Sequence, residues 1–258
     1  MLDLSGKNVV YVGGFSGVGY QVCRILMQKK ISHLFVCSRM ENMELLKVLQ
    51  DIAPTVNVVF VGVNILNRVS IEKAVAQIVG VVKHIDVLIN GVGALADKDV
   101  ETTIGLNLAG LINTTFACLP YMDKTQMGHG GVVVNIASVF GLEPATPFAV
   151  YAAAKHGVVG FTRSMGESHY YQKTGVCFVC VCPGLTSTEW MVNLRENVTW
   201  EHHSDEWLNL VSDSKHQTPE ECANGVVKAV EVMKNGGVYI CQSGQIKEVQ
   251  PTTYWHMQ

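Results

Sequence analysis

Short apolar runs alternate along the whole chain with amphipathic stretches. Seven runs are nearly continuous in Val, Ile, Phe and Cys, which is typical of strands in a parallel sheet whose two faces are both covered. These predicted strands are Asn8–Val12, His33–Cys37, Val56–Val63, Ile85–Asn90, Gly131–Ala137, Val176–Cys182 and Gly237–Cys241.

Six of the stretches between these runs repeat their apolar positions at helical spacing. The predicted helices are Val18–Lys29, Met43–Ile52, Ser70–Lys83, Asp99–Tyr121, Phe148–Tyr170 and Pro219–Asn235. Strands that alternate with helices predict an α/β fold, with a doubly wound parallel sheet and helices on both of its faces. We find no repeat or linker, so residues 1–258 are expected to form a single Rossmann-type domain.

One long segment, roughly Leu185–Gln217, shows neither pattern and carries Trp190, Trp200 and Trp207 among polar residues. A segment of this length in a compact domain is usually functional, and we expect a substrate lid. A surface excursion without a catalytic part is the alternative.

Composition excludes several classes of protein. Apolar residues make up 48% of the 258 residues and charged residues 16%, which excludes a disordered chain. With a net charge of -3 and scattered Lys and Arg, we expect neither a nucleic-acid nor a membrane partner. No signal segment or uninterrupted apolar run of membrane-spanning length is visible, so the eight cysteines are read as reduced thiols of a cytoplasmic protein.

Three cysteines lie close together at Cys177, Cys180 and Cys182, but we do not expect a metal site. On a strand, positions 177 and 180 point to opposite faces, and cysteine is among the most buried residue types. A core role is therefore preferred over a metal or redox cluster.

A glycine-rich segment follows the first predicted strand and opens the first helix. Glycine permits a tight turn and lets backbone N–H groups approach a pyrophosphate at a helix N-terminus. At this place in an α/β chain, the segment predicts a dinucleotide site rather than a turn required only for packing. It comprises Gly13, Gly14, Phe15, Ser16, Gly17, Val18 and Gly19.

The second predicted strand ends in Ser38 and Arg39, where many dinucleotide enzymes carry an acid that binds the adenine ribose. A neutral Ser38 does not repel a 2'-phosphate, and Arg39 could pair with one. The sequence therefore favours NADP(H) over NAD(H). A solvated Arg39 in an NAD enzyme is the alternative.

Tyr151 and Lys155 lie one helical turn apart, on the same face of a predicted helix. An ammonium beside a phenol, helped by an oxidised nicotinamide, is expected to lower the phenol's pKa and make it a usable base. Tyr-x-x-x-Lys alone is a weak signal. Ser138 strengthens it, because it follows a strand at the edge where open α/β sheets bind ligands. Asn107 interrupts an apolar helix, and either a water shared with Lys155 or a structural hydrogen bond would satisfy its amide.

These residues and their order resemble the short-chain dehydrogenase/reductase family over essentially the whole chain. The resemblance rests on Gly13, Gly17 and Gly19, on Ile89-Asn90-Gly91-Val92-Gly93, on Asn107, Ser138, Tyr151 and Lys155, and on Cys182-Pro183-Gly184-Leu185-Thr186. More narrowly, Asp86–Gly91 and Ile112–Thr115 resemble the insect alcohol dehydrogenase branch. Met122–Gly128 and Gly141–Pro144 resemble the fat-body proteins of flies within that branch.

The resemblance implies a nicotinamide-dependent alcohol dehydrogenase/reductase that interconverts a secondary alcohol and a carbonyl compound. Tyr151 would be the general acid/base, Ser138 the partner of the substrate oxygen, Lys155 the ligand of the ribose, and Asn107 the residue that holds a relay water. It further implies a homodimer packed through Asp99–Tyr121 and Phe148–Tyr170. The implied cofactor contacts are the glycine segment, Ser38, Arg39, Asn64, Ile65, Asn90, Gly91, Pro183, Gly184 and Thr186.

The chain departs from the insect pattern at two positions, since Ser38 and Asn64 stand where those enzymes typically have Asp. Both changes remove negative charge from the adenosine end, which agrees with a preference for NADP(H). Two other functions remain open: a binding or storage protein that retains the fold with little or no activity, and an epimerase or dehydratase that uses the same Tyr and Lys.

Overall fold

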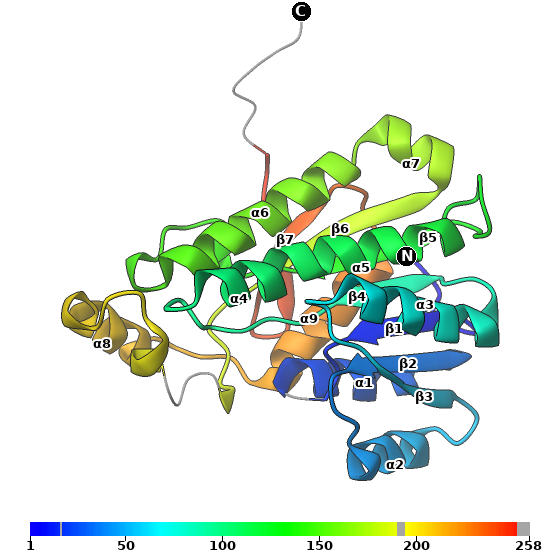
Figure 1. Ribbon diagram of the computed structural model, residues 1–258, viewed down its shortest axis with the longest axis horizontal. Helices are drawn as coiled ribbons and strands as arrows, with labels where there is room; N and C mark the ends of the chain where they lie inside the picture. The colour runs from blue at the N-terminus through cyan, green and yellow to red at the C-terminus, as the bar shows by residue number, and fades with distance from the viewer. Residues whose placement is uncertain (16, 190–193, 252–258) are drawn as a thin grey trace, which may run out of the picture.

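The computed structural model describes residues 1–15, 17–189 and 194–251, and an eight-stranded sheet forms its centre (Figure 1). The strand order is β3-β2-β1-β4-β5-β6-β7-β8, and every neighbouring pair is parallel except β7 and β8. The strands are β1 (Asn8–Val12), β2 (His33–Ser38), β3 (Asn57–Gly62), β4 (Val87–Asn90), β5 (Gly131–Ile136), β6 (Val176–Pro183), β7 (Val238–Gln242) and β8 (Gln245–Glu248).

Helices cover both faces of this sheet, which confirms the predicted doubly wound α/β fold. α1, α2 and α9 pack on one face, whereas α3, α5 and α6 pack on the other. The helices are α1 (Gly17–Met27), α2 (Met43–Ile52), α3 (Arg68–Val82), α4 (Val100–Ile104), α5 (Gly110–Cys118), α6 (Ala149–Met165), α7 (Ser168–Thr174), α8 (Asp205–Asp213) and α9 (Pro219–Val232).

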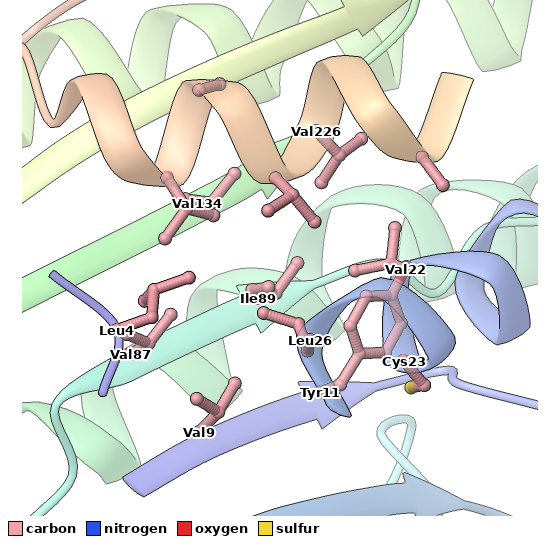
Figure 2. Close-up of a cluster of buried hydrophobic side chains, with 14 of the residues drawn as sticks. Leu4, Val9, Tyr11, Val22, Cys23, Leu26, Val87, Ile89, Val134 and Val226 are labelled. Carbon is pink, nitrogen blue, oxygen red and sulfur yellow. The ribbon is translucent and has the colours of Figure 1, made fainter. Parts of the chain in front are cut away.

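The core follows from strands that are apolar on both sides. Val9 and Tyr11 of β1 point toward α1 and α9, together with Ile89 of β4 and Val134 of β5 (Figure 2). Val10, the residue between the first two, packs with the cluster on the opposite face. Alternate side chains thus enter separate cores, which requires the continuous apolar runs seen in the sequence.

The strand order reverses between β1 and β4, because β1 leads outward to β2 and β3 while β4 leads to β5 and β6. In open α/β sheets, the carboxyl ends of the strands at such a reversal form the crevice where ligands bind. The loops after β1 and β4 therefore meet at the place where the sequence predicts a dinucleotide site.

Two predicted helices are each divided in the structure. The stretch Asp99–Tyr121 forms α4, a π-helical segment η1 (Gly105–Ala109), α5 and a final 3₁₀ turn. The stretch Phe148–Tyr170 ends its first helix at Met165, because Gly166 and the extended Glu167 separate α6 from α7.

The sequence pattern missed β8. Its residues are polar or only partly buried, and a strand at the sheet edge needs no apolar run on both faces. Ser243 and Gly244, which join it to β7, both have positive φ values of 49° and 73°, as a tight hairpin turn requires.

By length and composition, Val100–Tyr121 could also cross a membrane, with a mean hydropathy of 1.2 over its most apolar window. The contacts of its side chains within the protein account for this apolar composition. Leu111 and Cys118 pack into the cores beside the sheet, and Thr114 and Thr115 hydrogen-bond within α5. The stretch is a core helix of the domain.

The segment predicted as irregular, roughly Leu185–Gln217, is partly helical. It holds two 3₁₀ turns, Leu194–Asn197 and Glu201–His203, and then α8, which lies beside the start of α6 (Figure 1). Trp207 lies on α8, whereas Trp190 falls outside the described residues. Many positions of α8 are polar, so the sequence did not show apolar residues at helical spacing there.

Candidate active site

A cavity of about 900 Å³ opens at the carboxyl edge of the sheet. One end is lined by Gly13, Phe15, Gly17, Val18 and Gly19 of the glycine segment. The other end is lined by Ser138 and Tyr151 and by apolar side chains of the segment that holds α8. The cavity thus brings the predicted cofactor loop and the predicted proton-transfer residues together.

The glycine segment has the backbone shape that the sequence predicts. Gly13 adopts a φ of 101°, which favours glycine, and its N–H donates to Cys37 O at 2.7 Å. A Cβ at this position would lie 2.9 Å from the Val92 nitrogen in the loop after β4. The two loops therefore approach each other closely, with α1 beginning directly behind them.

The predicted adenosine end also lines the cavity. Ser38, Arg39, Asn64 and Ile65 all belong to its wall, at the ends of β2 and β3. Glu41 lines the same end, so Arg39 is not the sole charge there. The residues fit an adenosine group, and Arg39 is exposed enough to meet a phosphate.

Three residues of the predicted catalytic set meet at the opposite end. Ser138 and Tyr151 line the cavity, with exposed fractions of 8% and 6%, and their hydroxyls are hydrogen-bonded to each other. Lys155 lies one turn along α6, its Nζ 5.4 Å from the centre of the Tyr151 ring. That Nζ donates to Ile136 O at 3.0 Å, which holds it at the end of β5.

The pKa of Tyr151 is raised in the protein alone, whereas the sequence predicts a lowered pKa. Burial raises the pKa of this phenol well above its ordinary value, and the hydrogen bond with Ser138 lowers it only in part. Burial also lowers the pKa of Lys155 to about 8. In the protein alone, desolvation outweighs the effect of the neighbouring ammonium, so Tyr151 retains its proton.

The side chain of Asn107 is occupied by the backbone. Its Nδ2 donates to Ala94 O at 2.7 Å and to Thr103 O at 2.9 Å, and its Oδ1 accepts from Ala94 N at 3.2 Å. Fully buried in the π-helical segment, it is not among the residues lining the cavity. The structure thus provides the structural hydrogen bonds that were the alternative to a water-holding role.

The other predicted cofactor contacts divide into two groups. Gly91, Pro183, Gly184 and Thr186 line the cavity, as do Tyr151 and Lys155. Gly14 is buried, and Asn90 donates to Thr115 of α5 and Asn135 of β5 at 2.9 Å, so neither lines the cavity. Ser16 falls outside the described residues.

Several lining residues have no signal in the sequence pattern. Tyr11 lies under the glycine segment, and a Cβ at Gly91 would come within 2.4 Å of its hydroxyl. Around Tyr151, the apolar wall comes from distant parts of the chain, and only the fold brings these parts together. It consists of Leu95, Phe140, Phe148, Leu194, Trp207 and Val211.

The three cysteines of β6 lie in two separate cores, as the sequence predicts. Cys177 packs on the face of α1 and α9, whereas Cys180 and Cys182 pack on the face of α6. Burial raises the pKa of the Cys177 thiol to about 12, so it stays protonated at neutral pH.

Comparison with known proteins agrees with this geometry. The family model described as short chain dehydrogenase matches residues 7–199. The chain belongs to the short-chain dehydrogenase family. Its predicted resemblance to that family is confirmed.

Relatives from flies place the chain within the insect branch of this family. It is 59% identical to the development-specific 25 kDa protein of Sarcophaga peregrina, over 99% of this chain and all of the relative. It is 56% identical to fat body protein 2 of Drosophila melanogaster over the whole of both chains. With alcohol dehydrogenase 1 of Ceratitis capitata, the identity is 46% over 98% of each chain.

The fold of this short-chain dehydrogenase also matches solved structures. The L-sorbose reductase of Gluconobacter frateurii, solved with NADPH and L-sorbose, superposes with a TM-score of 0.79. The match covers 96% of this chain and the whole of that one at 20% identity, which shows a shared fold.

Proposed function

We propose that this short-chain dehydrogenase interconverts a secondary alcohol and its ketone by NADP(H)-dependent hydride transfer. The observation that carries the proposal is the meeting of Ser138, Tyr151 and Lys155 at one end of a cavity whose other end is the glycine segment. The insect alcohol dehydrogenase relative supports the same reaction class.

The cofactor would lie along the cavity, with its pyrophosphate at the glycine segment and the start of α1. Ser38, Arg39, Asn64 and Ile65 would hold the adenosine end, and Arg39 would pair with a 2'-phosphate. The remainder of the cofactor would be flanked by Gly91, Pro183, Gly184 and Thr186. When bound, the nicotinamide supplies or accepts the hydride at its C4 carbon.

Tyr151 would give its proton to the carbonyl oxygen as the hydride reaches the carbonyl carbon, which yields the alcohol. Burial keeps the phenol protonated beforehand, and this protonation state suits reduction. Ser138 would donate a hydrogen bond to the same oxygen, and Lys155 would bind the ribose and stabilise the phenolate left behind. Asn107, which fixes the loop at Ala94, would act in the proton relay through the position of this loop.

The substrate end of the cavity favours an apolar substrate. Phe140 and Phe148 both contact Trp207, with ring centres 5.4 and 5.3 Å apart. A hydroxyl buried among such rings without a partner costs about 1–3 kcal/mol. A substrate with one reacting oxygen and an otherwise apolar body therefore fits better than a polyol.

A homodimer and a reducing compartment complete the proposal. Phe116 on α5 is 51% exposed and packs edge-on against Phe161 of α6 at 5.8 Å, so these two helices present an apolar surface for a second copy. All eight cysteines are free and buried, which supports a location in the reducing cytoplasm.

Nicotinamide absorbance during turnover tests the proposed function. With NADPH, we expect oxidation of the cofactor by apolar ketones such as cyclohexanone and acetophenone, and little reaction with a keto-sugar such as sorbose. Cofactor binding without turnover of any of these would instead support the binding-protein alternative. Conversion of a substrate without net oxidation or reduction would support the epimerase or dehydratase alternative.

A further inference from the structure

A buried carboxylate that no motif identified lies beside the catalytic helix. Asp97, in the loop after β4, is only 2% exposed. Its Oδ2 accepts from Val150 N at 2.8 Å, and its Oδ1 accepts from Tyr151 N at 3.0 Å. Asp97 thus binds the backbone of the tyrosine that is proposed to transfer the proton.

These two bonds cap the start of α6. The first N–H groups of a helix have no partner within it, and a negative charge is stabilised there by the helix dipole. Phe148 occupies the N-cap position of α6 and makes no side-chain capping bond. Asp97 supplies the missing acceptors from 54 residues away in sequence, so the cap depends on the tertiary fold.

The same carboxylate holds the segment that leads to α8. The Thr199 hydroxyl donates its hydrogen to Asp97 Oδ2 at 3.0 Å and to Pro147 O at 3.1 Å as a shared bond, and Thr199 N donates to Pro147 O at 2.8 Å. Asp97 N in turn donates to Asn197 O at 3.2 Å. The chain around residue 199 is therefore bonded both to Asp97 and to the residues just before α6.

Packing joins the same parts of the molecule. Val198 is fully buried in one apolar cluster with Phe148 and Tyr151, and Trp207 packs against this cluster. Two neighbours of the buried bonds, Lys98 and Glu201, form a surface ion pair at 2.5 Å. The segment from Leu194 to Asp213, which lines the substrate end, is thus docked on the loop that carries Asp97.

We propose that Asp97 is a positioning residue that couples docking of the 194–213 segment to the placement of Tyr151. The kinetic effects of this coupling rest on the proposed function, whereas its structural effects do not. When the 194–213 segment undocks, Thr199 moves away from Asp97, and Asp97 loses a bond that orients its carboxylate toward α6. When Asp97 is replaced, both α6 and the segment lose their shared anchor.

Two substitutions test separately the contact of Asp97 with α6 and its contact with Thr199. D97N keeps the shape but replaces one accepting oxygen with an NH₂ donor, so it cannot accept from both Val150 N and Tyr151 N. We expect kcat to fall roughly 10-fold and KM for an apolar ketone to rise, with the Kd of NADPH unchanged. T199V removes the hydroxyl alone, so we expect a several-fold rise in KM with kcat nearly kept, and T199S should restore KM.

Hydrogen exchange supplies a readout that does not need turnover. In D97N, amides in the first turn of α6 and in residues 194–213 should both exchange faster, whereas those of β1 and α1 should not change. D99N is the matched control, because Asp99 caps α4 through Thr102 N at 3.0 Å in the same loop, and Asn is also a good cap. It should leave kinetics and exchange as in the wild type.

The coupling is contradicted if T199V leaves both KM and exchange of residues 194–213 unchanged, a result that does not depend on whether D97N folds. It is likewise contradicted if D97N lowers only the melting temperature while kcat and KM per folded molecule stay within twofold. If the wild type shows no turnover, the proposed function fails, and the exchange measurements alone decide on Asp97.

Discussion

At the scale of single residues, burial determines the state of the proton-transfer pair. Tyr151 and Lys155 are both nearly inaccessible, so desolvation raises the pKa of the phenol and lowers that of the ammonium to about 8. The protein alone therefore favours the neutral phenol, which is ready to donate a proton. Oxidation of an alcohol needs the phenolate, and the positive charges of Lys155 and of an oxidised nicotinamide would stabilise it.

Cofactor preference also depends on single residues. Ser38 and Arg39 line the end of the cavity that is proposed to bind adenosine, where a 2'-phosphate would meet a cation and no acid at position 38. We expect R39S to raise KM for NADPH by about 10-fold and to leave KM for NADH within twofold, because a charge-assisted hydrogen bond contributes about 1.5–3 kcal/mol. Initial rates with each cofactor measure this.

A substitution at Ser38 tests the same cofactor preference by adding an acid instead of removing the cation. S38D places a carboxylate where a ribose hydroxyl would bind and a 2'-phosphate would be repelled, so it should favour NADH over NADPH. An R39S variant that weakens NADH as much as NADPH would contradict a phosphate-binding role for Arg39.

At the scale of elements, α8 supplies part of the apolar wall beside Tyr151, where the substrate is proposed to bind. Trp207 projects from this helix to Phe140 and Phe148, which come from the chain on either side of the loop before α6. Neither the periodicity of the sequence nor its motifs predicted this wall. The three rings meet only because the segment 194–213 docks across the mouth of the sheet.

Substitution in α8 tests the apolar wall. We expect W207A to raise KM for acetophenone about 10-fold or more, because an aromatic contact of this size contributes on the order of 1–3 kcal/mol. NADPH affinity should not change, since Trp207 lies at the substrate end. W200A is the matched control, because Trp200 is 51% exposed and does not line the cavity. Equal effects of the two variants would contradict a substrate contact by Trp207.

Prediction from sequence succeeded best where one element carries the whole signal. β1, with five consecutive buried residues, and α2 were predicted with their observed bounds. Helical spacing also predicted that Tyr151 and Lys155 share one helix, α6, whereas their role in proton transfer was inferred together with Ser138 and stays a prediction. It failed where the signal is shared between distant parts. The cap on α6 comes from Asp97, and the edge strand β8 depends on a hairpin rather than on an apolar run.

At the scale of the whole molecule, the doubly wound sheet provides one edge at which every part of the site meets. The loops after β1 and β4 line the end proposed for the cofactor, while β5, α6 and the segment with α8 line the end proposed for the substrate. The cores on both faces hold these strands in fixed register, so the distance between the two ends is set by the sheet. Membership of the short-chain dehydrogenase family and this arrangement together support hydride transfer as the function.

Replacement of Tyr151 by Phe tests whether its phenol transfers the proton in an NADPH-dependent reduction. The steady-state rate of acetophenone reduction is measured for the wild type and for Y151F, each saturated with NADPH as verified by cofactor fluorescence. If Tyr151 transfers the proton, we expect turnover by the wild type and a loss of at least 100-fold in kcat for Y151F, with unchanged cofactor affinity. Equal rates for the two proteins would contradict it.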